Sequence, residues 1–232
     1  NGRADLVAVS EDTGEAAWTV DLGTLHQVNA PAAGNGRVYL TSTGHSDSFL
    51  WVYDQANGEL LRKEVLSSQW PSYSAPTLLG TDVYTINGYT GGISKYSDAQ
   101  GKFSWHGLGV AYAGWSPSTD GRYVYAYSTP DNILNVLDAA DGSWAYSIGD
   151  PYPFSTYFIS RPVVLTDTQQ AIVGDGNLAA FDVKNHTRSW IVDGASIGTP
   201  AYGNGTIYAF GANGTSLQAP APQTGNLLWQ VL

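Results

Sequence analysis

Ala221-Pro-Gln-Thr-Gly-Asn-Leu-Leu-Trp229 is the stretch that decides the fold, because it is one copy of a frame that recurs along the chain. A short polar turn ends in a glycine, and a tryptophan follows four residues later. The same turn ends at Gly14, Gly58, Gly101, Gly142, His186 and Gly225, and the residues four positions further on are Trp18, Arg62, Trp105, Tyr146, Trp190 and Trp229. Such internal similarity is typical of folds built from repeated structural units.

A second landmark alternates with these polar turns. It is a proline followed eight residues later by a tyrosine in an apolar run, as in Pro31 and Tyr39. The other copies are Pro76 with Tyr84, Pro117 with Tyr125, Pro200 with Tyr208, and Pro162 with the run Ala171-Ile172-Val173 in place of the tyrosine. Both landmarks therefore follow one period of about 40 residues.

The segments between the landmarks have the composition of β-strands. Runs such as Val38-Tyr39-Leu40-Thr41 are rich in β-branched and aromatic residues and are bounded by turn-forming residues. No stretch keeps a helical spacing of apolar residues. Repeats of this length with four strands each are the blades of β-propellers. We therefore predict an all-β protein, a β-propeller of four-stranded antiparallel blades with about six repeats, as one domain over residues 1–232.

The first blade is predicted to be incomplete. Six polar turns occur but only five proline landmarks, because few residues precede Leu6. Either the ring closes with one thin blade, or the chain is part of a longer propeller. Since the chain begins at Asn1 and has no methionine, we expect a processed product or a piece of a longer protein.

The repeat resembles that of the pyrroloquinoline-quinone enzyme family, and of its cofactor-free relatives in particular. In that family the polar turn and its tryptophan form a docking girdle between neighbouring blades. The resemblance implies that Trp18, Trp105, Trp190 and Trp229 hold blade against blade, with Arg62 and Tyr146 as weaker substitutes. Members commonly have more than six blades, which favours a longer propeller here.

The resemblance extends to the fold but not to the cofactor, because the residues that a quinone site needs are missing from the sequence. Cysteine is absent, and no acidic pair beside a tryptophan maps onto a quinone and calcium site. We expect no cofactor and no catalytic or metal-binding cluster, although calcium binding through Glu11-Asp12 or Asp175 stays open. The four histidines, His26, His45, His106 and His186, lie in different repeats without the spacing of a zinc site.

Charge and composition restrict the partners. With 20 acidic and 10 basic side chains the net charge is −10, so we expect no binding to nucleic acid. No apolar run is long enough to span a membrane as a helix, so no membrane insertion is expected. Acceptor triplets for N-glycosylation at Asn185, Asn204 and Asn213 suggest a secreted, extracellular glycoprotein.

Aromatic residues in the segments that connect blades are the candidate ligand-binding site. They stand beside Ser, Thr, Gln and Gly, and rings flanked by hydroxyl and amide groups suit sugars. This predicted aromatic surface consists of Trp70, Tyr73, Tyr89, Tyr112, Trp115, Tyr152 and Tyr157.

Three function classes follow, in order of preference. The first is a non-catalytic, secreted, lectin-like protein that binds carbohydrate through the predicted aromatic surface. The second is a protein-interaction scaffold with a protein ligand. The third is an enzyme, either a degenerate quinoprotein or a polysaccharide lyase or hydrolase that uses two loop carboxylates. The candidate carboxylates are Asp120, Asp131, Asp150, Asp167 and Asp175. The oligomeric state is left open.

Overall fold

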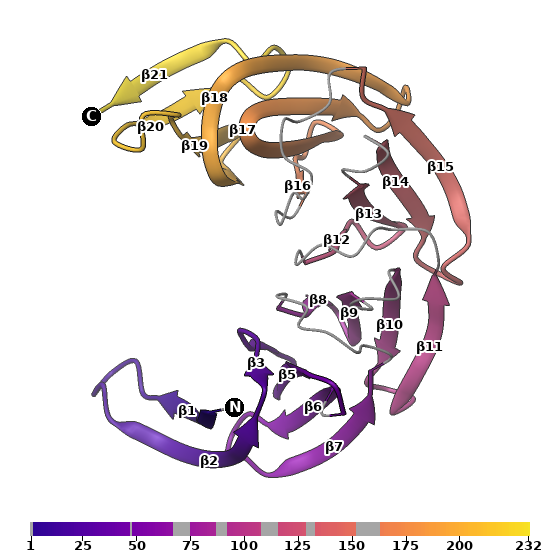
Figure 1. Cartoon of the computed structure of the whole chain (residues 1–232), viewed down its shortest axis with the longest axis vertical. Coiled ribbons are helices and arrows are strands. Elements are labelled where there is room, and N and C mark those ends of the chain that lie inside the picture. Colours follow the sequence, from indigo (N-terminus) through magenta and orange to yellow (C-terminus); the bar gives the residue numbers. More distant parts are fainter. Residues whose placement is uncertain are drawn as a thin grey trace. The chain divides into compact units, whose positions relative to one another are not determined.

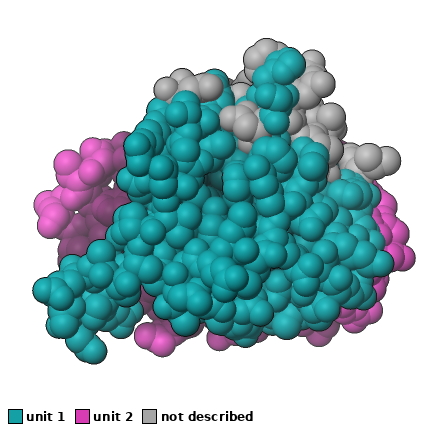
Figure 2. All heavy atoms as spheres, turned by 90° about the horizontal axis from the view of Figure 1, so that it is seen from below, with its two compact units in different colours: residues 1–116 teal, residues 117–232 magenta. Residues whose placement is uncertain are grey.

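The computed structural model describes residues 2–46, 48–66, 75–86, 92–107, 116–128, 133–151 and 163–232. Every regular element in these ranges is a β-strand (Figure 1). The chain divides into two compact units, residues 1–116 and 117–232 (Figure 2). No helix in the described ranges is long and apolar enough to cross a membrane.

Unit 1 contains one two-stranded sheet and two larger antiparallel sheets. The two-stranded sheet pairs β1 with β2, the second sheet has the order β3-β5-β6-β7 with β4 also paired to β5, and the third has the order β8-β9-β10-β11. The strands are β1 (Gly2–Val9), β2 (Ala16–Leu25), β3 (Gln27–Val28), β4 (Ala32–Gly34), β5 (Arg37–Thr43), β6 (Phe49–Asp54), β7 (Leu60–Val65), β8 (Thr77–Leu79), β9 (Asp82–Ile86), β10 (Ile93–Ser97) and β11 (Lys102–Gly107). The two-stranded sheet is the incomplete first blade that the missing proline landmark predicts.

Unit 2 contains a four-stranded sheet, β12-β13-β14-β15, and a six-stranded sheet that runs in order from β16 to β21. The strands are β12 (Ser118–Thr119), β13 (Tyr123–Ser128), β14 (Ile133–Asp138), β15 (Trp144–Gly149), β16 (Val164–Leu165), β17 (Gln170–Asp182), β18 (Thr187–Gly203), β19 (Thr206–Phe210), β20 (Leu217–Pro220) and β21 (Leu227–Val231).

The six-stranded sheet is two blades joined by bent strands. The first part of β17 pairs with β16 and its second part pairs with β18. The last part of β18 pairs with β19. Both strands turn back on themselves (Figure 1), and Gly176 and Gly198, both with φ +77°, supply backbone conformations that other residues rarely adopt. The prediction of four-stranded antiparallel repeats is confirmed.

All six polar turns share one backbone geometry. In each hairpin the side chain four residues after the turn pairs with a residue on the preceding strand. The pairing register of the two strands shifts immediately after that residue. The pairs at the shift are Ala8 with Trp18, Val52 with Arg62, Lys95 with Trp105, Val136 with Tyr146, Ala180 with Trp190, and Ala219 with Trp229. A repeated β-bulge re-aims one side chain in the same direction each time, so these six side chains, named girdle residues below, hold equivalent places.

Two of the girdle residues, Trp18 and Trp190, dock on the polar turn of the following blade. The Trp18 Nε1–H donates to the carbonyl oxygen of Gln55 at 3.0 Å, and the Trp190 Nε1–H donates to the carbonyl oxygen of Pro222 at 2.8 Å. Both acceptors are the second residue of their polar turn. For Trp18 and Trp190 the docking role implied by the family resemblance is therefore observed.

Three of the four tyrosines of the second landmark lie in the core, whereas Tyr208 is only partly buried. Tyr39, Tyr84 and Tyr125 are each 1% exposed. They stand on β5, β9 and β13, whose neighbouring strands supply further buried aliphatic side chains such as Leu50 and Val136. Burial of such large side chains is the main favourable contribution to the stability of each blade.

Three buried tyrosines of unit 1 give a prediction for alkaline pH. Burial raises the pKa of Tyr39, Tyr53 and Tyr96 to about 12, because desolvation disfavours the charged phenolate. Their folded pKa lies above the unfolded value of about 10. The stability that they contribute is therefore complete below pH 10 and is lost as the pH rises through 12.

Two measurements check the predicted loss of stability at alkaline pH. The ultraviolet absorbance of tyrosinate should rise late for the folded chain, and the urea midpoint should fall between pH 10 and 12. The variant Tyr53→Phe removes one of the three groups, so its midpoint should fall less over the same interval. Complete ionisation of the tyrosines near pH 10 while the chain stays folded would contradict the prediction.

Candidate functional site

The predicted aromatic surface lies outside the described residues. All seven of its members fall in the ranges 67–74, 87–91, 108–115 and 152–162, which separate the described segments. The hypothesis that these side chains bind a ligand therefore stays a prediction.

The three predicted glycosylation sites are described and exposed. Asn185 lies in the turn between β17 and β18, where its Nδ2 donates to Asp182 Oδ2 at 2.8 Å. Asn204 lies in the next turn with φ +51°. Asn213 lies between β19 and β20, and its Oδ1 accepts from the Ser216 hydroxyl at 2.9 Å. Glycosylation and secretion stay predictions, and a mass measurement of the natural protein would check the first of them.

The candidate carboxylates are engaged separately. Asp120 accepts a hydrogen bond from the Tyr125 hydroxyl, and Asp167 accepts one from Tyr202. Asp150 has a fully buried side chain and is treated below. The Asp131 residue and the Asp175 side chain lie outside the described part of the chain. Within that part, no three acidic or histidine side chains converge as metal ligands would.

A groove of about 480 Å³ lies in unit 2, where three turns of two consecutive blades meet. The turn between β12 and β13 supplies one wall, and the turns between β16 and β17 and between β17 and β18 supply the other. The side chains that line it are those of Asp120, Arg122, Tyr123, Tyr125, Tyr146, Leu165, Thr166, Gln169, Gln170, Val183, Lys184 and His186. We name it the interblade groove.

Hydrogen bonds fix the tyrosine-rich part of the interblade groove. Asp120 Oδ1 accepts from the backbone N–H groups of Arg122 and Tyr123 at 2.9 and 2.8 Å. Its Oδ2 accepts from the Tyr125 hydroxyl at 2.8 Å. Burial, and then this bond to Asp120, raise the pKa of Tyr125, so its hydroxyl stays a donor. The Tyr146 hydroxyl donates to the carbonyl of Val183 at 3.0 Å. These groups hold one another in place.

The rim of the interblade groove carries positive charge in an acidic protein. Among the described residues of unit 2 the lysines and arginines are Arg122, Lys184 and Arg188. Arg188 pairs with Asp150, whereas Arg122 and Lys184 line the groove and form no ion pair with a described carboxylate. The Arg122 guanidinium instead lies 5.0 Å from the centre of the Tyr123 ring, which is within the range of a cation–π interaction. The groove thus suits a ligand with negative charge.

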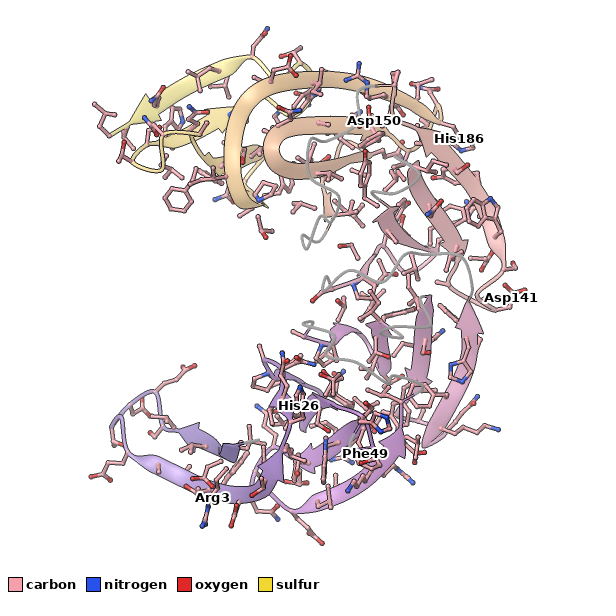
Figure 3. All side chains as sticks on the ribbon, viewed as in Figure 1. Arg3, His26, Phe49, Asp141, Asp150 and His186 are labelled. Atoms are coloured by element: carbon pink, nitrogen blue, oxygen red, sulfur yellow. The ribbon has the colours of Figure 1, made fainter. Side chains whose placement is uncertain are left out.

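His186 departs from the repeat at the edge of the interblade groove. It stands where the other five polar turns have glycine, and its φ of +56° is unusual for a residue with a side chain. Its ring stacks on the Tyr146 ring with centroids 3.8 Å apart and planes at 14°. Figure 3 places it at the turn between β17 and β18, beside β15. At this junction Tyr146 thus replaces the tryptophan, and His186 replaces the glycine, that meet at the Trp18 and Trp190 junctions.

The contact between Tyr146 and His186 predicts that substitutions at these two positions change the free energy of unfolding in a non-additive way. In Tyr146→Trp the indole meets the His186 ring, and in His186→Gly a space is left beside Tyr146. The double variant restores the tryptophan and glycine pair of the Trp190 junction. We expect it to be more stable than the sum of the single changes by about 1–2 kcal/mol. Urea unfolding of the four proteins measures this, and additive effects would contradict it.

The interblade groove is not marked by any motif in the sequence. Its polar residues Asp120, Gln169 and Lys184 belong to turns, and aspartates, glutamines and lysines in turns are usually structural. The signal in the sequence is the single departure from glycine at His186, together with Lys184 two residues before it.

The comparisons with known proteins agree on the fold. A family model described as "Outer membrane protein assembly factor BamB" matches residues 1–107 and 90–231. The crystal structure of BamB from Moraxella catarrhalis superimposes with a TM-score of 0.72 at 17% identity, over 98% of this chain and 70% of that one. A computationally designed protein, Ika8, gives 0.75 at 16% identity, over 94% of this chain and 65% of that one. No curated protein sequence matches.

The family match extends over nearly the whole chain, and the structural matches reproduce its fold at low identity. The prediction of an all-β propeller with quinoprotein-like repeats is therefore confirmed. The chain belongs to the family of the outer membrane protein assembly factor BamB.

Proposed function

We propose that this chain is a non-catalytic protein-interaction scaffold, and that the interblade groove binds an acidic segment of a partner polypeptide. The observation that carries the proposal is the meeting of Arg122 and Lys184 on a groove lined by three tyrosines. The family model describes a protein assembly factor, which agrees with a binding role.

The chemistry of the interblade groove favours recognition over turnover. Asp120 is the one carboxylate that lines it among the described residues, and both of its oxygens already accept hydrogen bonds. Tyrosines contribute contact area at low entropic cost. Arg122 and Lys184 form no ion pair with a carboxylate in the described part of the chain, so they attract acidic side chains and steer their approach. A short segment of chain with Asp or Glu beside an apolar residue satisfies both features.

An array of acidic, basic and neutral decapeptides tests the proposal, followed by fluorescence anisotropy with the best acidic peptide. We expect acidic peptides to bind and affinity to fall as salt rises. The double variant Arg122→Glu/Lys184→Glu should bind at least tenfold more weakly. The matched control, Arg3→Glu/Lys102→Glu, changes the net charge equally but alters exposed cations of unit 1, so it should bind as the parent does. Equal weakening by both pairs would exclude the groove.

Carbohydrate binding is the second candidate. The rings of Tyr123 and Tyr146 stand beside the hydroxyl of Thr166 and the amide of Gln169 in the interblade groove, and this combination suits sugars. A glycan array, read with calcium and then with a chelator, tests it. Binding that is lost in Tyr123→Ala would support a sugar in the groove. Binding lost instead in Trp70→Ala or Tyr112→Ala would support the predicted aromatic surface, and a blank array would exclude both.

A further inference from the structure

His186 is the one histidine that lines the interblade groove among the described residues. The other ionisable side chains that line it are one carboxylate, Asp120, two cations, Arg122 and Lys184, and tyrosines, whose hydroxyls are uncharged near neutral pH. Imidazole is the side chain that ordinarily gains and loses its proton between about pH 5 and pH 8. His186 is therefore the group through which a change of pH near neutrality can change the charge of the groove.

The ring of His186 is held in place by an aromatic stack. His186 stands beside β15 (Figure 3), and its ring centroid lies 3.8 Å from that of Tyr146 with the planes at 14°. Tyr146 is itself fixed, because its hydroxyl donates to the Val183 carbonyl at 3.0 Å and the Tyr123 ring meets it edge-on at 5.7 Å. The face of a tyrosine ring attracts a cation. The stack is therefore compatible with a protonated imidazole and keeps it at the groove.

Charged neighbours of His186 come first from its own turn and from the strand that follows. In the turn between β17 and β18 they are Asp182 and Lys184. Asp182 is engaged, because its Oδ1 accepts from the backbone N–H of Lys184 at 2.9 Å. On β18, Arg188 is paired with Asp150. His186 forms no ion pair with a carboxylate in the described ranges.

The facing elements supply the other charges. The turn between β12 and β13 brings Asp120 and Arg122 to the groove, and both oxygens of Asp120 already accept hydrogen bonds. The turn between β16 and β17 contains one carboxylate, Asp167, which does not line the groove. Strand β15 has no charged residue. A proton on His186 thus adds a third cation to a groove that is lined by two cations and one carboxylate.

We propose that protonation of His186 strengthens the binding of an acidic segment, so that the interblade groove holds its ligand more tightly as the pH falls from about 8 to about 5.5. The inference rests on the proposed function and adds a means of regulation to it. A carboxylate of the ligand pairs with the imidazolium, and an exposed pair of this kind changes affinity by about threefold to fivefold. Linkage requires the converse, so bound ligand raises the pH at which His186 is half protonated.

Fluorescence anisotropy with the best acidic peptide, at about pH 8 and about pH 5.5 and one ionic strength, tests the proposal. Glutamates of the peptide stay largely ionised, because their pKa is about 4.3. The parent should bind about threefold to fivefold more tightly at the lower pH. In His186→Asn this pH dependence should vanish, since asparagine does not titrate and adopts positive φ in this chain at Asn35 and Asn204. His45→Asn, which alters an exposed histidine of unit 1, is the control and should keep the dependence.

An NMR titration of the ¹³C-labelled histidine rings gives a second readout that needs no variant. Saturation with the peptide should raise the midpoint of His186 by about 0.5–0.7 in pH and leave that of His45 in place. Equal affinity at both pH values, a dependence that persists in His186→Asn, or a His186 midpoint that the peptide does not move would each overturn this inference and leave the scaffold proposal standing. If no acidic peptide binds at either pH, the proposed function fails, and this inference fails with it.

Discussion

Replacing Gly58 by alanine is expected to lower the free energy of unfolding by about 3 kcal/mol. Two causes add. The φ of +74° at Gly58 is unfavourable for any residue with a Cβ atom. The new atom would also lie 2.7 Å from the Trp18 ring, which forces the indole away from its turn and weakens its hydrogen bond to Gln55. Urea unfolding followed by tryptophan fluorescence measures the loss.

Gly23→Ala separates the two causes. Gly23 has the same φ of +74°, but a Cβ atom there meets nothing within 4 Å. Its loss should therefore be limited to the backbone cost, about 1 kcal/mol. Equal losses in the two variants would show that the girdle does not resist a side chain at the turn, and would contradict the docking of Trp18 on Gly58.

Replacing Asp150 by alanine is expected to cost about 3–5 kcal/mol, the usual penalty for removing one partner of a buried ion pair. The Asp150 side chain is fully buried, and its Oδ1 lies 3.7 Å from Arg188 Nε. Its Oδ2 accepts from the Tyr127 hydroxyl at 2.9 Å. The substitution leaves a largely buried guanidinium without this carboxylate. The free energy of unfolding in urea is the quantity to compare.

Two further variants test the charge argument. Tyr127→Phe removes the hydrogen bond from the Tyr127 hydroxyl to Asp150 and should cost about 1 kcal/mol. Asp150→Ala/Arg188→Met removes both charges together, and most of the stability lost in Asp150→Ala should return. If the double variant is no more stable than Asp150→Ala, the loss comes from the space left by the side chain and not from the stranded charge.

The architecture could be predicted because its signal is local and repeated. Each polar turn is closed by backbone hydrogen bonds between residues a few positions apart. The turn therefore has a fixed length, and the glycine and the tryptophan recur at a fixed spacing. The exceptions could be predicted as well. Arg62 and Tyr146 occupy girdle positions, where Arg62 packs against Gly101 and Tyr146 bonds to Val183.

The interblade groove could not be predicted in the same way. Asp120, Gln169 and Lys184 come from three turns of two blades, and their proximity depends on how one blade packs against the next. Each turn taken alone has an ordinary composition. The bends in β17 and β18 are a similar case, because the sequence marks them only by glycines that are common throughout the chain.

The most direct test of the proposed function is an NMR titration of the ¹⁵N-labelled chain with the acidic peptide that binds best. If the interblade groove is the site, the amide signals of Arg122, Tyr123, Lys184 and His186 should shift together and saturate at one affinity. The same peptide should leave these signals unchanged in Arg122→Glu/Lys184→Glu. Shifts confined to the loops around Trp70, Tyr112 and Tyr157, with the groove signals unmoved, would contradict the account.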